Sequence, residues 1–105
     1  ERIKSELIIA SKLVQKLSIL KENELLGARE IIDAFFYALL GEIRIALNVT
    51  RSKELVKAEN KVMECVGRLG NREYDGANKC ISEALSSVTT LGSEASKVLS
   101  ENGLL

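Results

Sequence analysis

The side chains that could do chemistry in this chain are few, and the most versatile of them is missing. The sequence contains no histidine, which removes the usual general base near neutral pH and the commonest nitrogen ligand for metals. A serine or cysteine nucleophile activated by histidine therefore cannot be assembled from this chain. Glycine-rich phosphate loops and the Glu-x-x-His pairs of di-metal bundles are missing too. We expect no enzyme activity, no cofactor and no metal site.

Two cysteines, Cys65 and Cys80, lie at similar distances on either side of a predicted turn at residues 70–72. In an antiparallel helical hairpin this spacing puts both at the same height, near the surface where the helices pack. Two interpretations stay open. The thiols are either buried as small apolar groups, or joined in a disulfide that links the two helices. Two cysteines without a histidine are too few ligands for a structural zinc ion.

A row of basic residues is the main candidate for binding a charged partner. Lys53, Lys57 and Lys61 repeat at four-residue steps and so share one helix face, and Arg68 follows on the same helix. Acidic residues interleave with them, and the 15 Lys and Arg residues of the chain balance its 15 Asp and Glu residues. The row is either an ordinary solvated face or a strip that contacts nucleic-acid phosphates.

Two charged residues lie within otherwise apolar sequence. Asp33 follows Ile32 in such a run and, if buried, needs a partner such as Arg29 one turn earlier. The sequence favours a carboxylate at the edge of the fold, in contact with water, over a ligand- or partner-binding role. Arg44 is expected to extend its long aliphatic stem from an apolar face towards solvent.

Four helical segments would position these residues. The apolar periodicity predicts helices over the ranges Arg2–Leu20, Glu24–Val49, Lys53–Leu69 and Arg72–Ser100. The polar residues beside the breaks predict an N-cap at Asn23, an N-cap at Ser52, and a C-cap at Asn102-Gly103. The chain contains no proline, and strand-forming residues follow the helical period, so no sheet is expected.

The second segment is apolar on almost every side, which a helix with one packing neighbour does not need. It carries two overlapping apolar rows, of which the first comprises Leu25, Ala28, Ile32, Phe35 and Leu39, and the second Phe36, Leu40, Ile43 and Leu47. Two explanations are open: this helix is the central and most buried one, or its second row meets a partner helix. We take the second row as the predicted partner-binding site.

The last segment has the most regular spacing, with apolar residues at three- and four-residue steps from Tyr74 to Val98. Its stretch Tyr74-Asp75-Gly76-Ala77, followed by Ile81 and by Ala84-Leu85, resembles the second helix of a tetratricopeptide-like helical hairpin. The resemblance covers residues 58–85 and implies two helices that pack closely through alanines. It further implies a peptide-binding adaptor.

These patterns predict one all-α domain over residues 1–105, an antiparallel four-helix bundle made of two helical hairpins, as a monomer or a dimer. The expected function is that of a non-enzymatic interaction module or accessory subunit, which binds a protein partner or itself through an apolar helix face. The alternative is an accessory protein that binds nucleic acid through the lysine row. No run of about 20 apolar residues is present, so we expect a cytoplasmic protein without a membrane span.

Overall fold

The computed structural model describes the backbone of residues 2–101 and the side chains of residues 2–21 and 24–91. Within that range the secondary structure consists of helices and contains no strand, as the sequence predicts. The elements are α1 (Arg2–Leu17), α2 (Glu22–Thr50), α3 (Lys53–Gly70) and α4 (Tyr74–Glu101).

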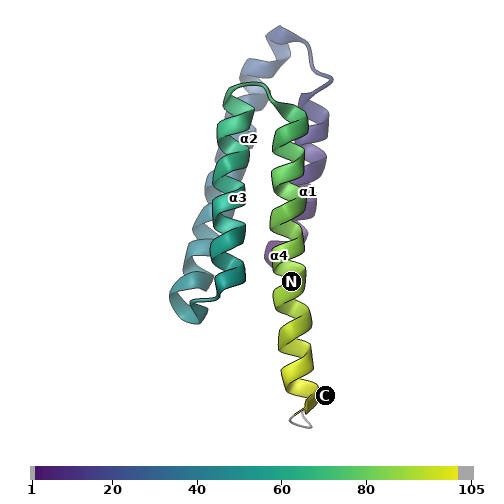
Figure 1. Ribbon diagram of the computed structural model, residues 1–105. Helices are drawn as coiled ribbons and strands as arrows, with labels where there is room; N and C mark the ends of the chain where they lie inside the picture. Colours follow the sequence, from purple (N-terminus) through teal and green to yellow (C-terminus); the bar gives the residue numbers. More distant parts are fainter. Residues whose placement is uncertain (1, 102–105) are drawn as a thin grey trace.

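The four helices form an antiparallel bundle in which successive helices run in opposite directions (Figure 1). Each helix contacts two others: α1 packs on α2 and α4, and α3 packs on α2 and α4. The contact between α3 and α4 is the most extensive of these. The predicted fold class, an all-α bundle of two helical hairpins, is therefore confirmed.

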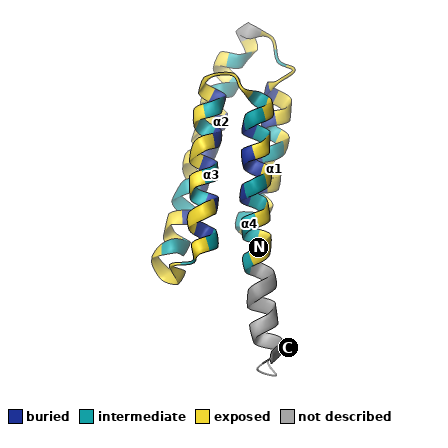
Figure 2. Cartoon of the chain, viewed as in Figure 1, coloured by how far each residue is buried: buried dark blue, intermediate teal, exposed yellow. Residues whose placement is uncertain are grey.

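The core lies along the axis of this bundle, where the buried stripe of each helix faces inward (Figure 2). Full burial of an aliphatic or aromatic side chain stabilises a fold by about 1.5–3 kcal/mol, and every helix contributes several. The core residues are Leu7, Ala10, Val14, Leu17, Ile32, Phe36, Leu39, Ile43, Ala58, Val62, Cys65, Leu69, Ala77, Cys80, Ile81 and Ala84.

The start of α3 follows the predicted chemistry. The Ser52 side-chain oxygen accepts hydrogen bonds from the backbone N–H groups of Glu54, at 3.2 Å, and of Leu55, at 3.4 Å. These are two of the amide groups that the first turn of a helix leaves without a backbone partner. Ser52 is thus the N-cap of α3, as predicted, and Glu54 adds a negative charge at the positive end of the helix dipole.

The start of α2 corrects a prediction. The N-cap is Lys21 and not Asn23, because α2 already begins at Glu22. The backbone N–H of Lys21 donates a hydrogen bond to the Glu24 carboxylate at 3.0 Å. The acidic side chain of the first turn therefore caps the N-terminus of α2.

Two other boundaries also differ from the prediction. The first helix ends at Leu17. Beyond it, the backbone N–H groups of Ile19 and Leu20 donate hydrogen bonds to the carbonyl groups three residues earlier, those of Lys16 and Leu17, which is the pattern of a 3₁₀ turn. The last helix begins at Tyr74, because Arg72 has a left-handed backbone with φ of 58° that cannot belong to a helix. The predicted C-cap at Asn102-Gly103 lies outside the described residues.

The position of α2 also differs from the expectation. Although it is the most apolar helix, α2 contacts α1 and α3 but not α4 within the described part of the chain, so it lies at a corner of the bundle. Large apolar side chains of α2 remain exposed, namely Leu26, Ile31, Tyr37, Ile45 and Val49. The expectation that the second helix is the central, most buried one is therefore wrong.

Candidate interaction surface

The predicted partner-binding row of α2 faces the interior of the bundle. Phe36 is 1% exposed and Ile43 is fully buried, so neither can contact a partner while the bundle is closed. Leu40 and Leu47 are partly buried and pack against the same core. Because its two bulkiest members are enclosed by the chain itself, this row belongs to the core.

The first apolar row of α2 also turns inward. Ile32 and Leu39 are buried, and Phe35 is partly buried with its ring edge-on to that of Phe36, with 6.0 Å between ring centroids. Two apolar rows on one helix are thus explained by two neighbours, since α2 packs on both α1 and α3. Together they occupy the core-facing half of the helix.

The opposite side of α2 carries a third apolar row, whose members are exposed except for Gly41, which is partly buried. We call it the outer face of α2, and its members are spaced four or three residues apart: Gly27, Ile31, Ala34, Ala38, Gly41, Ile45 and Val49. Ile31, Ile45 and Val49 are 73%, 68% and 81% exposed. The row contains no charged residue over about six helical turns, or about 33 Å.

A long uncharged row on a solvent-facing side is unusual for a helix that only has to cover a core. Two of its residues, Gly27 and Gly41, have nothing within 4 Å of the position that a side-chain carbon would occupy. Packing inside the chain therefore does not require glycine there. Glycine in a helix interior lowers the stability of the helix by about 1 kcal/mol relative to alanine. Packing within the chain does not explain this loss of stability at Gly27 and Gly41.

Sequence reasoning missed the outer face, although the spacing that marks it is present. From Gly27 to Ile45 the steps are four, three, four, three and four residues, the spacing of a helix-packing seam. Most of its members are glycine or alanine, so the bulkier rows on the other side of α2 dominate the pattern. The signal that marks the outer face in the sequence is therefore the absence of charge at these positions rather than the presence of bulky residues.

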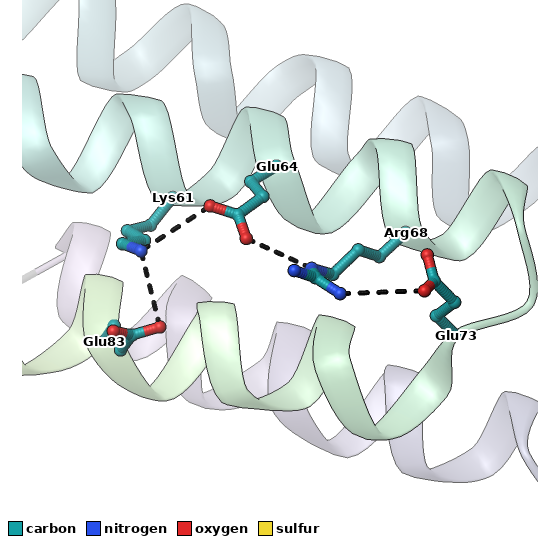
Figure 3. Close-up of polar contacts among 5 residues, drawn as sticks. All are labelled: Lys61, Glu64, Arg68, Glu73 and Glu83. Carbon is teal, nitrogen blue, oxygen red and sulfur yellow. Dashed lines mark hydrogen bonds and ion pairs between the residues drawn. The ribbon is translucent and has the colours of Figure 1, made fainter.

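Two members of the predicted basic row, Lys61 and Arg68, belong to an ion-pair network that joins α3 to α4 (Figure 3). Lys61 Nζ lies 3.5 Å from a carboxylate oxygen of Glu64 and 3.5 Å from one of Glu83. The Arg68 guanidinium lies 3.1 Å from Glu64 and 3.7 Å from Glu73.

Acidic and basic side chains alternate in this network, and they shift the pKa values of their neighbours. A hydrogen bond with the Cys80 thiol, together with Arg68 and Lys61, lowers the pKa of Glu64. The carboxylates of Glu64 and Glu83 raise the pKa of Lys61. Lys57 pairs with Glu54 at 3.4 Å, and Lys53 is exposed. Since most of these cations are neutralised by acidic neighbours, the row presents little net positive charge to a nucleic acid.

Cys65 and Cys80 are both buried between α3 and α4, and both are free thiols in this structure. Burial, and then the neighbouring Cys80, raise the pKa of Cys65 to about 12. Burial and the Glu64 carboxylate raise the pKa of Cys80. Both shifts keep the sulfur protonated, which makes it a poor nucleophile. The arrangement thus suits packing rather than catalysis.

The two remaining predicted polar residues lie at the surface. Asp33 is half exposed, and one carboxylate oxygen lies 3.8 Å from Arg29 Nε. Arg44 donates a hydrogen bond of 2.9 Å from Nε to Glu59 of α3, so it links two helices at their edge. Within the described residues, no group of three or more acidic or cysteine residues is placed to hold a metal ion.

Surface depressions lie around the turn between α3 and α4. One, of about 400 Å³, is wide open and is lined by Ser18, Arg68, Arg72, Glu73, Tyr74, Asp75 and Gly76. Its basic and acidic side chains partly pair with each other, as Arg68 does with Glu73. A shallow site of mixed charge does not enclose a small molecule.

Comparison with known proteins adds no assignment, because no family model, curated protein or solved structure matches the chain. None of the helices, as far as the structure describes them, combines the length and apolar character that a membrane crossing requires.

Proposed function

We propose that this chain is a non-enzymatic helical interaction module, which binds a protein helix through the outer face of α2. The observation that supports the proposal is the exposed, uncharged row from Gly27 to Val49. Helices recognise one another through apolar residues at three- and four-residue spacing, so the row has the form of a helix-docking site. The bundle beneath it would serve as a rigid scaffold.

The exposed side chains of this row favour a docking role over a purely structural one. Leaving Ile31, Ile45 and Val49 in water forgoes about 1.5–3 kcal/mol each that burial would provide. A contiguous apolar patch also promotes nonspecific association. Small residues between the bulky ones allow a second helix to approach closely, as in alanine-rich helix pairs.

A photo-crosslinking experiment tests the proposal. A benzophenone amino acid is placed at Ala38, in the middle of the outer face, and in a control protein at Ser82, an exposed polar position on α4. Each protein is irradiated in an extract of the source organism. We expect protein adducts, including adducts between copies, from Ala38 and not from Ser82. Equal adduct yields at both positions would contradict the proposal.

A further inference from the structure

We infer that the occupant of the outer face of α2 is a second copy of this chain, docked with its α2 antiparallel to the first. The inference rests on the proposed function and specifies the partner. It is carried by two independent kinds of self-complementarity, in side-chain size and in charge, which appear when α2 is paired with itself.

The first complementarity is steric. In an antiparallel pair related by a two-fold axis near residue 36, Ile31 faces Gly41 of the second copy and Ile45 faces Gly27. Each exposed isoleucine thereby fills the space that a glycine leaves open, since apart from the adjoining helix backbone no atom of the chain lies within 4 Å of the missing side-chain carbon. Large residues opposite small ones are what close helix packing requires.

The middle of the same pair is formed by alanines. Ala34 faces Ala38 of the second copy, and the two-fold axis repeats this contact on its other side. Both alanines are exposed in the single chain. A parallel pair would instead stack Ile31 on Ile31 and leave a gap between two copies of Gly41. The size pattern therefore fits the antiparallel arrangement better.

The second complementarity is electrostatic. Glu30 and Arg44 lie on the same flank of the outer face, seven residues on either side of Tyr37. The antiparallel pairing brings Glu30 of each copy beside Arg44 of the other, and it brings the two Tyr37 side chains together near the axis. Arg44 is half exposed, bonded to Glu59 through Nε and in contact with Met63 Sδ through Nη2, so its Nη1 can reach a second carboxylate. A parallel pair would offer neither ion pair.

The helix dipoles add to this preference, since antiparallel helices place opposite partial charges side by side. The two-fold arrangement is also closed: each outer face is used once, so pairing through this face stops at two copies. The same surface that would make a single chain prone to association thus becomes the interior of a dimer.

The first test measures self-association of the full chain by sedimentation equilibrium from about 1 to about 100 µM, the range that reports micromolar affinity. We expect a dimer. The Ala38→Glu variant should raise the dissociation constant at least about tenfold, while its circular dichroism stays helical. Val56→Glu, at an exposed apolar position on α3, is the matched control and should dimerise like the unmodified protein.

The second test determines the orientation. Tyr37→Cys places a thiol near the two-fold axis, whereas Glu30→Cys places two thiols about 18 Å apart along an antiparallel pair, from a rise of 1.5 Å per residue. Mild oxidation should link the Tyr37→Cys protein across the dimer and leave the Glu30→Cys protein unlinked. A parallel dimer would keep each pair of thiols at equal height but on opposite flanks of the interface, so neither variant would be linked.

The outcomes separate the inference from the proposed function. A chain that stays monomeric at the highest concentration, a dimer that Ala38→Glu leaves intact, a Tyr37→Cys dimer that oxidation does not link, or linking of the Glu30→Cys dimer would each overturn the inference. If Ala38 then crosslinks to a different protein in extract, the proposed function stands without it. If Ala38 yields no specific adduct to any protein, including a second copy, both fail.

Discussion

The hydroxyl of Ser11 donates a hydrogen bond of 2.9 Å to the side-chain oxygen of Asn78. This bond joins α1 to α4 across 67 positions of sequence, and its partners follow the buried core residues Ala10 and Ala77 in the chain. Apolar packing is nondirectional, whereas a partly buried hydrogen bond requires one relative position of its partners. The pair therefore helps to fix how the first helix lies along the last.

Replacing Ser11 with alanine should destabilise the bundle. The change removes a bond worth about 0.5–1.5 kcal/mol and leaves Asn78 without this partner, while alanine raises the helix propensity of α1. Ser5→Ala, at an exposed position of the same helix, measures the propensity gain alone. In urea unfolding, Ser11→Ala should be less stable than Ser5→Ala by about 1 kcal/mol. Equal stability of the two variants would show that the bond contributes nothing.

Neighbouring residues of α2 should respond very differently to truncation. Phe36 is enclosed by the core, whereas Tyr37 is 80% exposed. Phe36→Ala should lower the free energy of unfolding by about 3–5 kcal/mol, and Tyr37→Ala by less than about 0.5 kcal/mol under monomeric conditions. Since Phe36→Ala approaches the total stability of a small domain, Phe36→Leu provides a milder second measurement. A similar loss at both positions would contradict the inward orientation of Phe36.

Much of the fold could be predicted from sequence because each helix shows its own period. The apolar steps of α3 and α4 predict their buried sides, and Ser52 predicts where α3 begins. These are local signals, carried by residues within one or two turns of each other. Helix boundaries that depend on backbone conformation are harder to predict from sequence. Arginine has no preference for a left-handed φ, so its residue type does not predict the conformation of Arg72.

The candidate site could not be predicted in the same way. Two bulky rows on α2 were compatible with a central helix among the other three or with a row that meets a partner helix, and sequence alone does not say how many helices lie against α2. The structure answers this question, because α2 packs against α1 and α3 and its Phe36 and Ile43 side chains are buried. Once both bulky rows are known to face the core, the outer face of α2, with its glycines and alanines, is the apolar surface of this helix that remains for a partner.

An acidic pair between α1 and α2 predicts an effect of pH. Burial, followed by the neighbouring Glu42, raises the pKa of Glu6, although Arg2 lies within 3.4 Å of Glu6 and 2.9 Å of Glu42. A raised pKa means that ionisation is disfavoured in the folded state. The favourable contribution of neutral Glu6 is complete below the ordinary value of 4.5 and is lost as pH rises through the raised value.

The Glu6→Gln variant, which stays neutral, should therefore be more stable than the unmodified protein at neutral pH. The two proteins should converge as the pH falls below 4.5, where Glu6 is protonated in both states. Urea unfolding of both proteins at neutral pH and at a pH below 4.5 measures this difference. A variant that is less stable at neutral pH would show that the attraction of Arg2 outweighs burial and repulsion.

The two buried thiols should be nearly inert in the folded protein and reactive once it unfolds. Because the pKa of Cys65 rises from 9.0 to about 12, its thiolate fraction near pH 8 falls by about a thousandfold, and the thiolate is the nucleophile. Iodoacetamide should label the native protein at least about a hundredfold more slowly than the urea-unfolded protein, as followed by mass spectrometry without reductant. Labelling of both cysteines in urea would show free thiols, and absence of label until reductant is added would show a disulfide instead. Rapid labelling of Cys65 in the native protein would contradict its burial between α3 and α4.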